Sequence, residues 1–194
     1  MQAGVDHAGR QDPIKARLPA GVSVQAMPDR TLTDMLIKGE IDAMITARPP
    51  RRFTEGAPGL RRLYPDFREE EERYFAKTGI FPIMHVIAMK RSVYEANRWI
   101  ARNLFDAFDA AKRASITRLY NIQSSYIVTG WVPEDLRRTH RLLFGDGEPW
   151  PYGLEHNRAT LEPFLAYCDE QGITQRKLSP DELFPKELAF EVKI

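Results

Sequence analysis

Along the first half of the chain, some stretches show the spacing of apolar residues that is typical of strands, and others show the spacing that is typical of helices. Residues 22–27 (VSVQAM) alternate strictly enough to predict a short half-buried strand. Thr31 opens a capping motif before apolar positions on one helical face, and Gly39 ends that helix. The apolar runs 41–46 (IDAMIT) and 86–89 (VIAM) are typical of buried parallel strands.

The helical period dominates the remainder of the chain. Capping residues and apolar positions three or four residues apart predict a succession of helices. Their predicted positions are 67–78, a helix start at Ser92, 97 to about 120, 133–144, 157–171 and a short helix opened by Ser179 and Pro180. Residues 145–153 (GDGEPWPYG) contain glycine and proline at spacings that predict a loop.

This order of elements predicts the fold class. Strands separated by helices pair in parallel, so we expect an α/β fold. Three short strands make a thin sheet whose edges need partners. The predicted helices are more numerous than so small a sheet can cover. Either the sheet receives strands from elsewhere, or the chain is part of something longer.

Composition narrows the class of protein. Hydrophobic residues make up 43% and charged residues 28%, which is typical of a folded soluble domain and argues against disorder. The net charge of +1 gives no support to a nucleic-acid partner. The single cysteine, Cys168, excludes an intrachain disulfide and a thiolate metal cluster. No apolar run has the length of a membrane span or of a signal peptide, so a cytoplasmic location is predicted.

A set of motifs then points to a family. Residues 39–45 (GEIDAMI) look like the helix end and strand of a type II periplasmic-binding-protein lobe. The further motifs are TGIFPIMHVIAM at 78–89, WIARNL at 99–104, AFDAAK at 107–112, WPYGLEHN at 150–157, PFLAY at 163–167, EQG at 170–172 and LF at 183–184. In this order and spacing they resemble the 4,5-dihydroxyphthalate decarboxylase family, a cytoplasmic group related to transporter solute-binding proteins.

The resemblance implies a type II periplasmic-binding-protein-like α/β architecture. Members of that family are longer at the amino end, so we expect one lobe, carboxyl-terminal helices and an incomplete first lobe. We expect an extended entry segment (1–20), an α/β substrate-binding lobe (21–90) and a helical part (91–194) that packs on the lobe and hinge. An apolar face left by the incomplete lobe would lie open or be covered by another chain, for example in a homo-oligomer.

The resemblance also implies a reaction. An aromatic dicarboxylate such as 4,5-dihydroxyphthalate would lose one carboxylate and become a catechol monocarboxylate. The alternative is a non-catalytic solute-binding protein that captures a small carboxylate for an ABC-type transporter. Decarboxylation needs a general acid for the ring carbon, a cation for the carboxylate that stays, and walls that exclude water. No cofactor is expected.

Arg48 is the candidate clamp for a carboxylate. It follows the predicted strand 41–46, where open α/β sheets bind their ligands, and guanidinium groups bind carboxylates in a bidentate fork. Thr46 could add a hydroxyl donor. The loop that follows is rich in arginine, and its other members are interpreted as solvated residues that neutralise an acidic helix. They are Arg51, Arg52, Arg61 and Arg62.

His85 is the candidate acid–base residue, because histidine titrates near neutral pH and this one begins a predicted buried strand. A core histidine or a purely ligand-binding one is the alternative. His7, His140 and His156 are predicted to lie in an extended start, on a charged helix and at a helix cap. The four histidines show no spacing typical of metal ligands, so no metal site is predicted.

Trp150, Tyr152 and Glu155 form an aromatic and acidic group next to the predicted loop. An aromatic pair in such a loop either plugs the core or lines a ligand cleft. The plug is the favoured interpretation. As lining residues, the three would be candidates for substrate binding together with Thr46 and Arg48.

Overall fold

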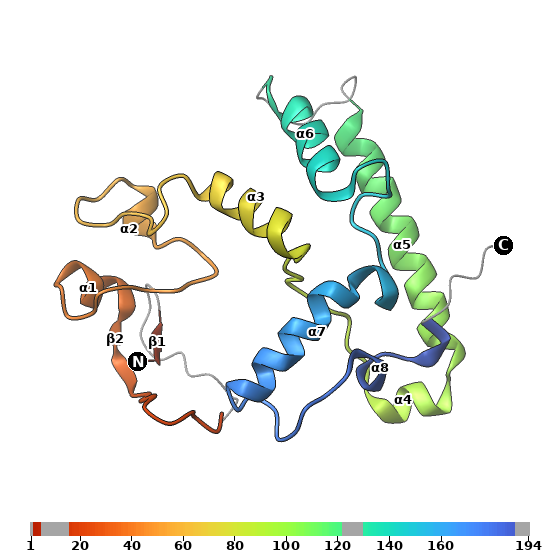
Figure 1. Cartoon of the computed structure of the whole chain (residues 1–194), viewed down its shortest axis with the longest axis horizontal. Coiled ribbons are helices and arrows are strands. Elements are labelled where there is room, and N and C mark those ends of the chain that lie inside the picture. The colour runs from red at the N-terminus through yellow and green to blue at the C-terminus, as the bar shows by residue number, and fades with distance from the viewer. Residues whose placement is uncertain (1, 5–15, 122–129, 189–194) are drawn as a thin grey trace. The chain divides into compact units, whose positions relative to one another are not determined.

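A computed structural model describes residues 2–4, 16–121 and 130–188 of the chain (Figure 1). The chain divides into two compact units. Unit 1 comprises Met1–Glu70 and Tyr167–Arg176, and unit 2 comprises Glu71–Ala166 and Lys177–Ile194. The three segments expected from the sequence have other boundaries and remain predictions. His7 lies outside the described residues.

Unit 1 contains a small parallel sheet. Strand β1 (Gln2–Gly4) pairs with strand β2 (Ala26–Thr31), and Gln2 lies opposite Ala26. The predicted strand at 22–27 is therefore displaced toward the carboxyl end, and within the described residues the sheet has two strands instead of three. The helices that follow are α1 (Leu32–Ile37) and the short α2 (Arg51–Thr54).

Two of the predicted strands are wrong. The structure assigns bends and irregular backbone to residues 41–46, and Ile45 is fully exposed. Residues 86–89 belong to an irregular segment between helices, and Val86 and Ile87 are exposed as well. A strand exists only through hydrogen bonds to a neighbouring strand, so an apolar run without such a neighbour does not form one. In the described part of the chain, neither run has a partner strand.

The predicted start of α1 is confirmed. The Thr31 hydroxyl accepts a hydrogen bond from the Asp34 amide at 3.1 Å, which satisfies one of the unpaired donors of the first turn. Gly39 follows the helix with φ at 70°, in the left-handed region that favours glycine. Met35, only 2% exposed, is the most deeply buried residue of this unit's small core.

The carboxyl end of α7 (Leu154–Glu170) belongs to unit 1, where it meets the segment before β2. The Arg17 amide donates a hydrogen bond to the Gly172 carbonyl at 2.8 Å. Gly172 is buried with φ at 69°, and a β-carbon placed on it would lie 1.8 Å from the Arg17 carbonyl oxygen. The backbone approaches so closely here that only glycine fits.

Unit 2 is helical among its described residues. Its elements include α3 (Phe67–Thr78, shared with unit 1), α4 (Arg91–Ala96), α5 (Trp99–Tyr120), α6 (Val132–Phe144), most of α7, α8 (Pro180–Leu183) and the 3-10 turn η2 (Lys186–Leu188). Helices α5 and α6 contact each other and lie side by side in Figure 1. The predicted bounds of α3 and the predicted cap and first proline of α8, Ser179 and Pro180, are confirmed.

Two predicted caps are wrong, and both are asparagines. Asn97 is the C-cap of α4, and α5 begins after Arg98. Asn157 lies inside the first turn of α7, which begins three residues earlier at Leu154. Asparagine side chains bond to nearby backbone groups on either side of a helix end, so residue type alone does not fix the position.

Many large apolar side chains are exposed. The irregular segment between α3 and α4 is the clearest case, with Met84 at 70% and Ile87 at 66% exposure. Trp99 and Phe108 of α5 are also exposed, and Ala101 is the buried residue of that helix. None of the described helices is long and apolar enough to cross a bilayer.

Candidate functional site

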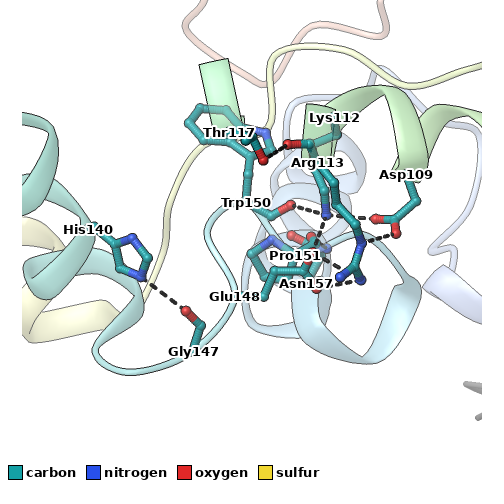
Figure 2. Close-up of polar contacts among 10 residues, drawn as sticks. All are labelled: Asp109, Lys112, Arg113, Thr117, His140, Gly147, Glu148, Trp150, Pro151 and Asn157. Carbon is teal, nitrogen blue, oxygen red and sulfur yellow. Dashed lines mark hydrogen bonds and ion pairs between the residues drawn. The ribbon is translucent and has the colours of Figure 1, made fainter. Parts of the chain in front are cut away.

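The loop between α6 and α7 (residues 145–153) is held by polar contacts from several elements of unit 2. Figure 2 shows side chains from α5, α6 and α7 converging on it. It contains Trp150 and Tyr152, two of the candidate substrate-binding residues. What holds this loop therefore decides how those two side chains are presented.

Lys112 of α5 is the central anchor of the loop. Its ammonium group donates to Asp109 at 2.7 Å, to Glu148 at 3.1 Å and to the Trp150 carbonyl at 3.2 Å. It also lies 4.5 Å from the centre of the Tyr152 ring, which is within the range of a cation–π contact. The Lys112 side chain is only 6% exposed. An ammonium group has three protons to donate, so this arrangement satisfies the buried charge.

Arg113 strengthens the same ion-pair group from the solvent side. Its guanidinium contacts Asp109 at 2.7 Å and Glu148 at 3.1 Å, while its own side chain stays mostly exposed. Burial alone raises the pKa of Asp109, but hydrogen bonds from Lys112 and Arg113 lower it more. The pKa of this carboxyl is therefore below its usual 3.8.

This lowered pKa predicts a pH-dependent contribution to stability. A carboxyl whose pKa is lowered by folding stabilises the folded state above about pH 3.8, and that contribution is lost as pH falls through the folded-state pKa. Asp109→Asn should lower the free energy of unfolding at pH 6, and the difference from wild type should shrink toward pH 3. Urea unfolding at the two pH values measures this.

Asp106→Asn serves as the control for that experiment. It removes a carboxylate from the same helix, which pairs with Arg102 at 3.0 Å and is about half exposed. Exposed ion pairs contribute little, so its effect should be small at both pH values. An Asp109→Asn effect that is equal at pH 6 and pH 3 would contradict the predicted linkage.

Two further side chains hold the loop from α6 and α7. His140 Nε2 lies 3.0 Å from the Gly147 carbonyl, which can only accept, so this nitrogen carries a proton. Its Nδ1 lies 3.1 Å from the Tyr120 hydroxyl. The Asn157 amide donates to the carbonyls of Pro151 at 2.9 Å and Gly153 at 2.8 Å. With both ring nitrogens engaged, His140 is a structural residue of the loop.

Trp150 has an unusual backbone. Its φ of 56° lies in the left-handed region, which is strained for a bulky residue. The indole packs edge-to-face on Phe81, with ring centres 5.0 Å apart and planes at 88°, and also contacts Phe144. It remains 53% exposed. The loop thus holds a large aromatic ring partly in solvent at the cost of backbone strain.

Phe81 is itself fixed to α7. The Thr160 hydroxyl accepts from the Phe81 amide at 3.3 Å and donates to the Phe81 carbonyl at 3.2 Å. One hydroxyl thus pairs both backbone groups of the residue against which Trp150 packs. The aromatic group of Phe81, Phe144 and Trp150 therefore joins the segment after α3 to the end of α6 and the loop that follows it.

Comparison with known proteins shows similarity over most of the chain. The chain is 31% identical over 185 residues to a 4,5-dihydroxyphthalate decarboxylase of Comamonas testosteroni, covering 95% of this chain and 56% of the relative. A protein of the same name from Pseudomonas putida is 42% identical over 67 residues, which are 34% of this chain and 26% of the relative. The resemblance to the 4,5-dihydroxyphthalate decarboxylase family is confirmed.

This resemblance rests on the two relatives. No protein-family model matches the chain. The chain spans about half of the length of the Comamonas decarboxylase, since it covers 56% of it. The activity and substrate of the whole protein are therefore taken up below as a proposal.

Among the residues that the family resemblance singled out, Trp150 and Tyr152 lie in the anchored loop, and Glu155 lies beside it. Tyr152 packs on Phe105 with ring centres 6.3 Å apart, as a plug would. Glu155 instead pairs with Arg158 at 2.5 Å, and hydrogen bonding to that guanidinium lowers the pKa of Glu155. Arg158 also bonds Asp181 at 3.0 Å beside a hollow of about 540 Å³.

The other candidates lie elsewhere. Thr46 and Arg48 belong to unit 1, where the Thr46 hydroxyl donates to the Arg48 carbonyl at 2.9 Å and accepts from its amide at 3.3 Å. Arg48 is exposed and does not follow a strand. His85 is in unit 2, exposed and in the irregular segment before α4. Their roles remain predictions.

The anchors of the loop were not predicted from the sequence. Asp109, Lys112 and Arg113 are spaced at i, i+3 and i+4 on α5, a signal for a paired helix face. That spacing does not predict the contacts of Lys112 with Glu148 and with the Trp150 carbonyl, which lie 36 and 38 residues away in the sequence. Among the described residues, no three histidine, cysteine or acidic side chains form a group able to hold a metal ion.

Proposed function

We propose that this protein decarboxylates an aromatic dicarboxylate of the 4,5-dihydroxyphthalate type to a catechol monocarboxylate. The observation that carries the proposal is the 31% identity over 95% of the chain to a relative of that name. The aromatic, half-exposed Trp150 in the anchored loop gives it support from the structure. A type II periplasmic-binding-protein-like architecture is part of the same proposal.

The proposed reaction exchanges carbon dioxide for a proton. The ring hydroxyl para to the leaving carboxylate donates electron density to the ring, and a general acid protonates the carbon that bears this carboxylate. The bond from that carbon to the carboxylate then breaks, carbon dioxide leaves, and the ring recovers its aromaticity. The second carboxylate stays on the product and needs a cation to hold it.

His85 is proposed as the proton donor. Both ring nitrogens of His140 are engaged within the loop, so we assign it a structural role instead. His85 lies in unit 2, in the irregular segment that Phe81 fixes to α7 four residues earlier. Trp150 would stack on the catechol ring, because an exposed indole offers a large apolar face at low entropic cost.

Arg48 is proposed as the clamp for the retained carboxylate, and its removal is a direct test. Arg48→Ala should weaken the binding of 4,5-dihydroxyphthalate by about 1.5–3 kcal/mol, the usual contribution of a hydrogen bond to a charged group. Isothermal titration calorimetry measures this. Arg51→Ala is the matched control, because Arg51 is an exposed arginine three residues away that pairs with Glu55 at 2.7 Å. Equal effects of the two variants would remove Arg48 from the site.

The decisive experiment measures binding and carbon dioxide release on the same samples. The folded protein is incubated with 4,5-dihydroxyphthalate and related aromatic dicarboxylates. Release of one carbon dioxide per molecule of monocarboxylate formed supports the proposed reaction. Tight binding with no release across these compounds would contradict it and favour a non-catalytic solute-binding protein.

A further inference from the structure

We propose that Lys112 is a positioning residue, which holds Trp150 in its left-handed backbone conformation and so presents the indole to the ring of the substrate. Because it presumes an aromatic substrate, this role rests on the function proposed above. Lys112 itself is too buried to meet the substrate, with 6% of its side chain exposed.

The contacts of Lys112 are suited to this role. Its bond to the Trp150 carbonyl, at 3.2 Å, acts on the residue whose backbone is strained. Its contact with the Tyr152 ring and its ion pair with Glu148 fix the loop two residues to either side of Trp150. Three contacts across five residues leave the loop little freedom to relax the strain.

The ion-pair group also provides an internal comparison. Arg113 touches the same two carboxylates, Asp109 and Glu148, from the next position in the chain. Lys112 in addition contacts the Trp150 carbonyl, as Figure 2 shows, and the Tyr152 ring. If Lys112 acted only by neutralising the acids, removing either cation would have similar consequences.

The test is the environment of Trp150, observed by fluorine NMR. The chain contains three tryptophans, so labelling with 5-fluorotryptophan gives few resonances, and the one absent in Trp150→Phe belongs to Trp150. Lys112→Met removes the ammonium while nearly keeping the length of the side chain, and Arg113 still pairs both acids. Arg113→Met is the matched control.

Lys112→Met is expected to shift and broaden the Trp150 resonance alone and to weaken binding of 4,5-dihydroxyphthalate about tenfold. Arg113→Met should leave the Trp150 resonance in place and the affinity within about twofold. An unchanged Trp150 resonance in Lys112→Met, or equal changes in the two variants, overturns the proposal. So does an equal shift of all three resonances, since that reports a general loss of structure.

Two further arrangements distinguish failure of this proposal from a variant that does not fold and from failure of the proposed function. If Lys112→Met does not fold, Lys112→Gln replaces it, because the neutral amide is one atom shorter and cannot reach the same three acceptors. If the wild-type chain does not bind 4,5-dihydroxyphthalate, the proposed substrate is wrong, while the NMR comparison still decides whether Lys112 holds Trp150.

Discussion

His85→Gln is expected to lower turnover of 4,5-dihydroxyphthalate by about 10²–10⁴, the usual contribution of a positioned acid–base group. Glutamine keeps hydrogen-bonding capacity but cannot deliver a proton at neutral pH. Substrate affinity should therefore stay close to that of wild type while the rate of carbon dioxide release falls. Steady-state release and equilibrium binding, measured on the same preparation, separate the two effects.

His156→Gln is the matched control for this experiment. It makes the same substitution at another exposed histidine of unit 2, in the first turn of α7. Its turnover should equal that of wild type. Unchanged turnover in His85→Gln would show that the proton comes from another group. A solute-binding protein would instead show altered affinity in His85→Gln and no carbon dioxide from the wild type.

Gly172→Ala is expected to lower the free energy of unfolding by about 3 kcal/mol or more. A left-handed φ of 69° costs an L-residue about 1–2 kcal/mol. The new β-carbon would also lie 1.8 Å from the Arg17 carbonyl oxygen, so the backbone must move and its hydrogen bond with Arg17 is strained. Chemical denaturation followed by circular dichroism measures the change.

Gly39→Ala separates the two causes. Gly39 has φ at 70°, almost the same as Gly172, but a β-carbon there meets nothing within 4 Å. It should therefore show only the conformational cost, about 1–2 kcal/mol. Similar losses at the two positions would mean that the contact between Gly172 and Arg17 does not contribute to the stability of unit 1.

Helix ends were predicted correctly where the residue type at the end has one structural role there. The carboxyl end of α3 at Gly79 and the N-terminal motif of α8 at Ser179 follow from contacts within a few residues. Asn97 and Asn157 failed because asparagine bonds to backbone on either side of a helix end. The strands failed for a different reason, since pairing depends on a partner far away in the sequence.

The residues of the candidate site likewise fall into those that the local sequence predicts and those that tertiary contacts determine. The motif WPYGLEHN drew attention to Trp150 and Tyr152 because it is one of the motifs that carry the family resemblance and because it places two aromatic residues in a predicted loop. The group that holds them could not be predicted, because Lys112 meets Glu148 and the Trp150 carbonyl only after α5 and the loop pack together. The strained φ of Trp150 is likewise a product of tertiary contacts, since residue type alone argues against it.

The irregular segment between α3 and α4 is also relevant to aggregation of the protein. Its residues 83–89 (IMHVIAM) join β-branched and other apolar side chains without an acid or a lysine, and several of them face water. Such a stretch is a template for cross-β stacking between chains. Pro82 precedes it, and Lys90 and Arg91 follow it, which are the residue types that natural sequences place as gatekeepers beside aggregation-prone segments. We therefore expect substitutions of these three flanking residues to increase aggregation.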